Sequence, residues 1–91
     1  MHKNDSKMNL VVTSPNEVLF KGEASKVVVP TNDGLIGILP HHQATICLLG
    51  HGEMIVTVDG KDVLVRKVES GIVEIRPDNK VIVLLKEHNQ E

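Results

Sequence analysis

Aromatic side chains are almost absent from this sequence: Phe20 is the only ring among its 91 residues. A hydrophobic core must therefore be built from valine, isoleucine and leucine, and the β-branched members of this set favour strands. Base stacking on aromatic side chains is common in proteins that bind single-stranded nucleic acid, and phosphate binding needs clustered basic residues. The scarcity of rings, the net charge of −2 and the scattered basic residues argue against a nucleic-acid partner.

Cysteine and long apolar runs are also scarce. Cys47 is the only cysteine, so no disulfide can form within the chain, and its apolar neighbours predict a buried thiol in a reducing compartment. No apolar run approaches the ~18 residues that span a membrane, and the polar start at residues 1–7 does not resemble a signal peptide. We therefore expect an intracellular chain with no direct membrane insertion.

What the chain does contain is a series of short, alternating apolar and polar runs separated by turn residues. We predict strands over residues 8–13, 17–20, 24–29 (closed by Pro30), 43–49, 53–58, 62–68, 72–76 and 80–85. A two-turn helix over 43–49 is the competing interpretation, since so short an apolar run does not reveal its period. The pair Asp59-Gly60 predicts a hairpin with a primed turn.

These strands predict an all-β fold, an antiparallel sandwich or flattened barrel. A chain of 91 residues is long enough for one core only, so we predict a single domain over 1–91. Its ordered core is expected over about 8–86, with frayed polar ends.

Residues 34–42 are unusual because they are apolar like a core strand and interrupted like a loop. Gly34 and Gly37 permit backbone angles that other residues avoid, and Pro40 fixes its own φ and removes an amide donor. Large aliphatic side chains between such breaks are costly to leave in water. We therefore expect a partner to cover part of this segment, with a bend of the chain at Gly37 and Pro40.

Histidines 2, 41, 42, 51 and 88 are the candidates for metal binding or catalysis. Adjacent strand residues point to opposite faces, so His41 and His42 do not readily share one ion, and no thiolate or carboxylate pair lies at ligand spacing. No glycine-rich loop leads into a helix that could hold a phosphate. The sequence thus predicts no catalytic residue, no metal, no cofactor and no bound nucleotide.

Three separated motifs carry a resemblance to a known family. They are residues 27–30 with 34–42 (VVVP and GLIGILPHH), residues 10–15 with 18–22, and residues 71–79. In this order, from about residue 8 to residue 85, they resemble the epsilon subunit of F-type ATP synthase. The resemblance covers a short form, because the two-helix carboxyl-terminal domain of the family has no counterpart in the sequence.

The resemblance implies the family's amino-terminal sandwich of two roughly five-stranded sheets. It also implies a non-catalytic subunit of the rotating central stalk, which links the gamma subunit to the polar loops of the membrane c-ring and couples proton transport to ATP synthesis. Such a complex lies at the cytoplasmic face of the bacterial inner membrane. Nucleotide binding by the family's helical hairpin does not carry over.

The matching positions in the motifs imply two contact surfaces. The gamma-facing residues are His42, Ser14 and Cys47. The ring-facing residues are Asp33, Gly34, Leu35 and Ile36. The sequence departs from the family pattern at Leu35 (usually acidic), His41 (glycine), Ala44 (proline) and Ser70 (glycine), which predicts a more apolar ring contact. The alternative function is a stand-alone ligand carrier or enzyme that uses His41 or His42, and binding to gamma distinguishes the two.

Overall fold

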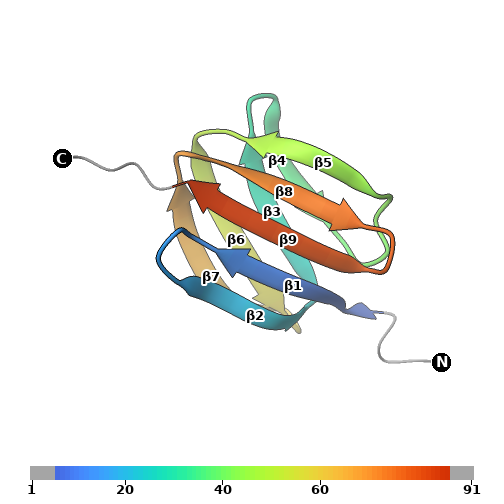
Figure 1. Cartoon of the computed structure of the whole chain (residues 1–91). Helices are drawn as coiled ribbons and strands as arrows, with labels where there is room; N and C mark the ends of the chain where they lie inside the picture. Colours follow the sequence, from blue (N-terminus) through green and yellow to red (C-terminus); the bar gives the residue numbers. More distant parts are fainter. Residues whose placement is uncertain (1–5, 87–91) are drawn as a thin grey trace.

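The computed structural model describes residues 6–86, which form nine strands in two layers (Figure 1). The strands are β1 (Met8–Thr13), β2 (Val18–Ala24), β3 (Lys26–Thr31), β4 (Gly34–Ile38), β5 (Thr45–Leu49), β6 (Gly52–Val58), β7 (Lys61–Val68), β8 (Ser70–Arg76) and β9 (Lys80–Lys86). The predicted fraying of the chain ends concerns mostly residues 1–5 and 87–91, which lie outside the described residues. Within residues 6–86 there is no helix long and apolar enough to cross a membrane.

The two layers are a five-stranded sheet in the order β2-β1-β9-β8-β5 and a four-stranded sheet in the order β4-β3-β6-β7. They face each other as a sandwich, which confirms the predicted fold class (Figure 1). Two details differ from the prediction. The second sheet has four strands, and β1 pairs with β9 in parallel, from Asn9 opposite Lys80 to Thr13 opposite Leu84. The parallel pair brings the first and last strands together at the centre of the larger sheet.

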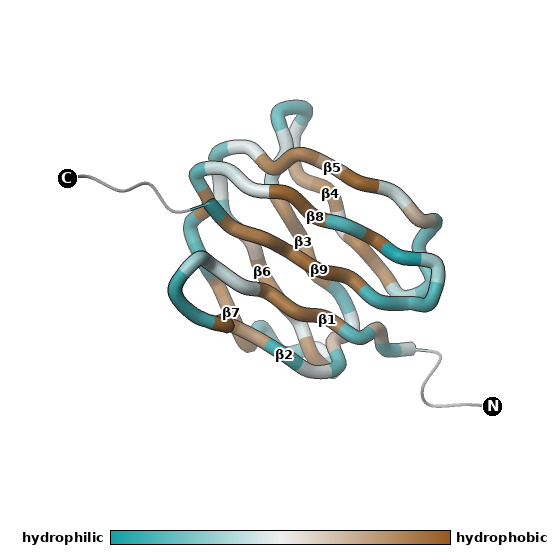
Figure 2. The backbone as a smooth tube through the Cα atoms, in the orientation of Figure 1, coloured by the Kyte–Doolittle hydropathy of each residue, from teal (hydrophilic) through white to brown (hydrophobic). Residues whose placement is uncertain are grey.

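The core lies between the sheets and follows the period-2 alternation of the strands. In β1, Met8, Leu10 and Val12 are buried, and Val81 and Val83 of the neighbouring β9 point to the same side. Figure 2 shows that strands of both layers have apolar segments in their middle. Burying a side chain of this kind contributes about 1.5–3 kcal/mol, so a core of aliphatic side chains with Phe20 packed against it can stabilise the domain.

The segment over 45–49 is a strand, so the helical alternative is wrong. Its register with β8 runs without a shift from Thr45 opposite Ile75 to Leu49 opposite Gly71. Cys47 and Leu49 pack toward the core, whereas Ile46 and Leu48 are exposed. This alternation is that of a strand and not of a helix.

The expected bend at Gly37 is also wrong, because Gly37 lies inside β4 and pairs with Val28. The chain turns after Pro40 instead, where His41 has a φ of 63°. Gly34 does use its freedom, with a φ of 118° at the end of the β3–β4 turn. The interrupted segment is therefore one edge strand followed by a loop.

Two predicted strand ends were placed too early. Pro30 lies within β3, opposite Leu35, because the ladder between β3 and β6 stops at Val28 and needs no amide donor from Pro30. Strand β2 continues through Gly22, which pairs with Leu10 of β1. In both cases pairing with a neighbouring strand outweighs the local tendency to break.

The predicted hairpin between β6 and β7 is confirmed. Asp59 and Gly60 occupy the two turn positions with φ of 51° and 83°. Positive φ at both central residues is the mark of the primed turn that matches strand twist.

Candidate functional site

The outer face of the five-stranded sheet carries a row of exposed apolar side chains. Strand register places Leu48 opposite Ile72 and Ile72 opposite Leu84. Their exposed fractions are 67%, 40% and 48%. Side chains at opposed positions of neighbouring strands lie within contact distance, so Leu48, Ile72 and Leu84 form a continuous strip, which we call the outer row. Ile46, exposed on the same strand as Leu48, extends it.

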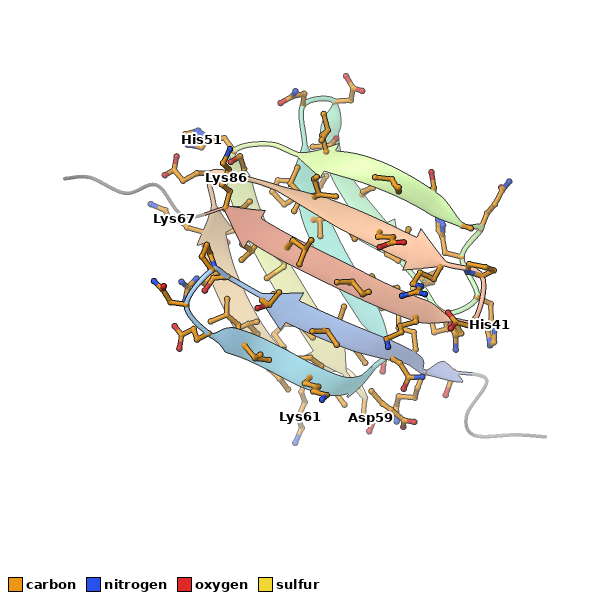
Figure 3. The ribbon with its side chains drawn as sticks, in the orientation of Figure 1. His41, His51, Asp59, Lys61, Lys67 and Lys86 are labelled. Atoms are coloured by element: carbon orange, nitrogen blue, oxygen red, sulfur yellow. The ribbon has the colours of Figure 1, made fainter. Side chains whose placement is uncertain are left out.

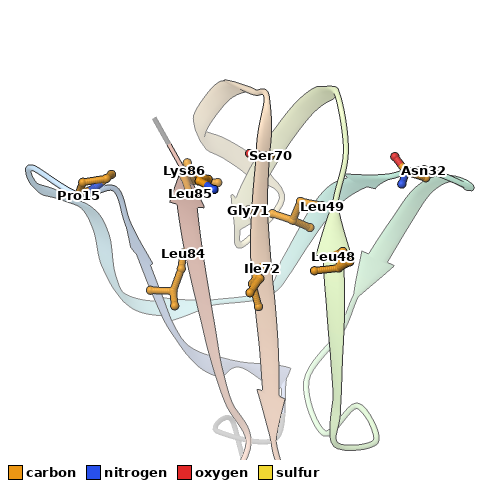
Figure 4. A pocket seen from close by; sticks show the side chains of 10 residues that line it. All are labelled: Pro15, Asn32, Leu48, Leu49, Ser70, Gly71, Ile72, Leu84, Leu85 and Lys86. Carbon is orange, nitrogen blue, oxygen red and sulfur yellow. The ribbon is translucent and has the colours of Figure 1, made fainter. Parts of the chain in front are cut away.

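A hollow of about 510 Å³ lies over the outer row. Figure 4 shows Leu84, Ile72 and Leu48 side by side on three strands, with Pro15 beyond one side and Asn32 beyond the other. Lys86 contributes a cationic group, and the remaining lining residues are Leu49, Ser70, Gly71 and Leu85. An apolar floor with polar groups at its margin is the arrangement found at the centre of a protein interface.

The candidate residue Ser14 directly follows β1, whose last residue Thr13 pairs with Leu84 near the end of β9. Its side chain is buried, its backbone amide donates to the Glu17 carbonyl at 2.9 Å, and its Oγ lies 3.4 Å from the same oxygen. Ser14 therefore shapes the turn between β1 and β2.

The two other gamma-facing candidates lie on and before β5. His42 is exposed in the β4–β5 loop, with Nδ1 2.8 Å from the Gln43 carbonyl oxygen. Cys47 is half-buried, and its side chain packs against the core. Because β1 and β5 run in the same direction, Ser14 at the end of β1 and His42 before β5 lie at opposite ends of the sheet. The structure therefore places all three around one sheet without bringing them into contact.

The ring-facing candidates Asp33, Gly34 and Leu35 lie at the β3–β4 hairpin, which projects past the end of β5 (Figure 1). Thr31 fixes the tip: its Oγ1 donates to the Gly34 carbonyl at 2.7 Å and accepts the Asp33 amide at 3.1 Å. The Leu35 side chain is exposed. Ile36 is partly buried and packs against the core, so only part of its surface is open to a partner.

The loop that carries His42 is attached to the rest of the molecule through Asn79. The His41 amide donates to Asn79 Oδ1 at 2.8 Å, and Asn79 Nδ2 donates to the Lys7 carbonyl at 2.8 Å. Both His41 and Asn79 have a φ of 63°, which is uncommon among non-glycine residues although asparagine and histidine adopt it more readily than most. The backbone that presents His42 is therefore fixed by a long-range bond.

Within the described part of the chain, no group of three or more histidine, cysteine, aspartate or glutamate side chains is close enough to hold a metal ion. His51 pairs with Glu69 at 2.8 Å on the surface. Figure 3 shows His51 at the end of the molecule opposite His41. His2 and His88 lie outside the described residues.

None of the sequence motifs indicated the outer row. A signal was present in residues 46–49, where four consecutive apolar residues leave no polar face for a strand. An antiparallel sheet with one solvated face normally alternates apolar and polar residues. A run that is apolar on both faces therefore indicates a strand whose outer side is covered by something else.

Three comparisons place the chain among known proteins. Residues 7–89 match the family model described as ATP synthase, Delta/Epsilon chain, beta-sandwich domain. An ATP synthase epsilon chain from Leptospira interrogans is 38% identical over 79 residues, which cover 87% of this chain and 61% of the relative. One from Neisseria meningitidis is 44% identical over 79 residues, covering 85% and 55%. The chain thus spans little more than half the length of these curated relatives.

Two solved structures share the fold. A chain of the Euglena gracilis mitochondrial ATP synthase (OSCP/F1/c-ring) superposes with a TM-score of 0.81 at 22% identity, over 88% of this chain and 51% of that one. A chain of the Tetrahymena thermophila mitochondrial ATP synthase (central stalk/c-ring) gives 0.73 at 16% identity, over 89% and 64%. Both similarities are to single chains of ATP synthase complexes, and at these identities they show a common fold. With its sandwich fold and a family match over nearly the whole chain, this protein belongs to the ATP synthase delta/epsilon family, of which it forms the beta-sandwich domain.

Proposed function

We propose that the chain acts in the central stalk of a bacterial F-type ATP synthase, where it links the gamma subunit to the c-ring and couples proton transport to ATP synthesis. The observation that carries this proposal is the outer row, an exposed apolar strip on a domain of this family. Soluble monomers rarely leave such a strip uncovered without a partner. The complex acts at the cytoplasmic face of the inner membrane, and the domain itself binds no nucleotide.

The gamma subunit docks on the outer face of the five-stranded sheet. The outer row forms the apolar centre of this interface, and Ser14 and His42 lie at its two ends. Cys47 lies between the exposed Ile46 and Leu48 on β5, and its side chain packs against the core, so it supports this part of the surface from the inner side. In interfaces of this kind a few central side chains carry most of the binding free energy.

The c-ring docks on the tip of the β3–β4 hairpin. The tip projects beyond the sandwich, and its bonds to Thr31 hold Asp33 and Gly34 in one conformation. A rigid tip loses little conformational entropy on binding. Leu35 and the open part of Ile36 add apolar contact next to the charge of Asp33.

Titration with purified gamma subunit tests the first surface. Leu84→Asp places a charge in the outer row and should weaken binding by about 2 kcal/mol or more. Val65→Asp is the matched control, because Val65 has a similar exposed fraction of 52% but lies on the four-stranded sheet. His42→Asp should weaken binding by ~1–3 kcal/mol with unchanged melting. If the unaltered chain does not bind gamma, the proposal is wrong and the alternative of a ligand carrier or enzyme gains support.

The coupling role is tested in membranes that contain an epsilon-depleted ATP synthase. Adding the chain should restore ATP-driven proton pumping, and Leu35→Lys should reduce this restoration while gamma binding is kept. Calorimetric titration of the isolated chain with ATP should give no saturable heat. A saturable ATP signal would contradict the absence of a nucleotide site.

A further inference from the structure

One flank of the sandwich is formed by two edge strands that carry no charge. The four edge strands are β2 and β5 in the larger sheet and β4 and β7 in the smaller one. The flank with β2 and β7 is charged, through Lys21, Glu23, Lys61, Asp62, Arg66 and Lys67. Strands β4 and β5, by contrast, contain no charged residue. Edge strands expose unpaired backbone groups, and charged side chains are one of the usual means of keeping other strands away.

The two uncharged edges differ in how well they could accept another strand. Strand β4 contains Gly34 and Gly37, and glycine weakens strand pairing. Gly34 also has a φ of 118°, outside the strand region. Strand β5 has no glycine, no proline and no bulge, and its five pairs with β8 are in continuous register. The free edge of β5 is therefore the one edge in the described sandwich that lacks these protections.

We propose that β5 pairs antiparallel with β5 of a second copy of this chain, related by a two-fold axis, when the protein is free of other subunits. Antiparallel pairing of a strand with itself is compatible with a two-fold axis, so the same residues meet from both sides. The segment Thr45–Leu49 is uncharged, so self-pairing brings no like charges together. The two larger sheets then form one continuous sheet.

Side chains on the flank add apolar contact to the backbone pairing. Ile46 and Leu48 have exposed fractions of 67% each and lie on the outer face of the pairing strand. In the dimer each meets the outer side chains of the partner's β5, so the outer row continues from one copy into the other.

The contact consists of one short strand and a few side chains, so the dimer is weak. Specific, stable interfaces bury about 800 Å² per partner, and smaller contacts belong to transient encounters. We expect a dissociation constant of ~10–100 μM, which corresponds to about 5–7 kcal/mol. The dimer is therefore visible only in concentrated solution.

Sedimentation equilibrium of the full chain from micromolar to millimolar concentration tests the proposal. The unaltered chain should shift from monomer to dimer. Leu48→Lys places two lysines near the two-fold axis and should weaken dimerisation by ~10-fold or more. Val18→Lys is the matched control: Val18 has an exposed fraction of 60% and lies on β2, the opposite edge of the same sheet. The Val18→Lys variant should dimerise as the unaltered chain does.

Two further measurements distinguish a dimer that pairs through the β5 edge from one that packs through the outer face of the sheet. Leu84→Lys charges the centre of the outer face and should leave an edge-paired dimer largely intact, whereas a face-to-face dimer would be lost. Amide hydrogen exchange of the unaltered chain should slow with concentration in β5 and not in β2. The proposal would be overturned if the unaltered chain stayed monomeric at millimolar concentration. It would also be overturned if Leu48→Lys and Val18→Lys weakened dimerisation equally, or if Leu84→Lys abolished dimerisation.

Discussion

The two ends of the sandwich are held together by different kinds of contact. At one end, side chains from distant segments are hydrogen-bonded or ion-paired: Asn79 to His41 and Lys7, Lys7 to Asp59, and Ser25 to Asp59. We call this the clasp end. At the other end lie the β3–β4 turn, Gly50, Gly52 and Gly71, which we call the hairpin end. A Cβ atom added at any of these three glycines would lie within 3.0 Å of another atom, which belongs to the Asn32 side chain, the Pro30 ring or the Leu84 backbone.

The close approaches among the described glycines all lie at the hairpin end, although Gly34 in the same region has free space around it. They occur at Gly50, Gly52 and Gly71. Gly22 and Gly37 have no neighbour nearer than 3.8 Å, and Gly34 and Gly60 have none within 4 Å. The clasp end thus depends on polar contacts between distant segments, and the hairpin end depends on the lack of a side chain at three glycines. Substitutions should therefore act by loss of hydrogen bonds at one end and by steric overlap at the other.

The largest effect is expected at Gly71. A Cβ atom there would lie 2.5 Å from the Leu84 carbonyl oxygen and 3.2 Å from the Leu85 Cα, both backbone atoms of the paired strand. Gly71→Ala should lower the free energy of unfolding by about 2–3 kcal/mol, because the strands must separate to make room. This corresponds to a fall in Tm of roughly 10–20 °C for a domain of this size.

The control for Gly71→Ala is Gly37→Ala in edge strand β4. Its added Cβ would meet only the end of the Lys26 side chain, at 4.0 Å. Thermal unfolding of this variant should give an unchanged or slightly higher Tm, since alanine in a strand is favoured over glycine. Equal destabilisation by both variants would show that the close approach at the hairpin end is not what matters.

At the clasp end the largest effect is expected at Asn79. Asn79→Ala removes one acceptor and one donor, leaves the His41 amide and the Lys7 carbonyl without these partners, and places alanine at a φ of 63°. We expect a loss of about 2–3 kcal/mol in chemical denaturation. Asn79→Gly removes the same bonds without backbone strain, so its smaller loss measures the bonds alone. If Asn79→Gly were as stable as the unaltered chain, the two bonds would contribute nothing.

Most of the fold could be predicted from the sequence because the alternation of apolar and polar residues is a local property. The hairpin at Asp59-Gly60 was predicted down to its turn class, since only a few residues tolerate positive φ. The errors at Pro30 and Gly22 have a common cause. Both residues break strands on average, and only the partner strand decides whether the break occurs.

The candidate site was less predictable. The resemblance to the family motifs pointed to Ser14, His42 and Cys47. The outer row instead arises from the pairing of β5, β8 and β9, which brings together Leu48 and Leu84 from distant parts of the sequence. No local pattern shows which strands will be neighbours. The bond from Asn79 to His41 spans 38 positions and was missed for the same reason.

A smaller effect is expected for the ion pair between Lys7 and Asp59 at the clasp end. The two groups are 3.1 Å apart, but the Asp59 side chain is 71% exposed, so water and salt screen the pair. A double-mutant cycle with Lys7→Met and Asp59→Asn should give a coupling free energy of about 0.2–1 kcal/mol, reduced further in high salt. Asparagine keeps the backbone conformation at position 59. A salt-independent coupling well above this range would show that the pair is shielded from solvent.

The smallest effect is expected for the polar pair at the hairpin end, His51 and Glu69. Its two side chains are 76% and 58% exposed, and an exposed pair contributes little once both side chains lose rotamer freedom. His51→Ala should therefore change the free energy of unfolding by less than about 0.5 kcal/mol.

The neighbouring Gly50→Ala provides the contrast, because its Cβ would lie 2.7 Å from Asn32 Oδ1 and 3.2 Å from the Asn32 amide nitrogen. Two adjacent positions should thus differ clearly in Tm. A large loss of stability in His51→Ala with little change in Gly50→Ala would mean that polar contacts between distant segments hold the hairpin end as well, and the distinction between the two ends would be wrong.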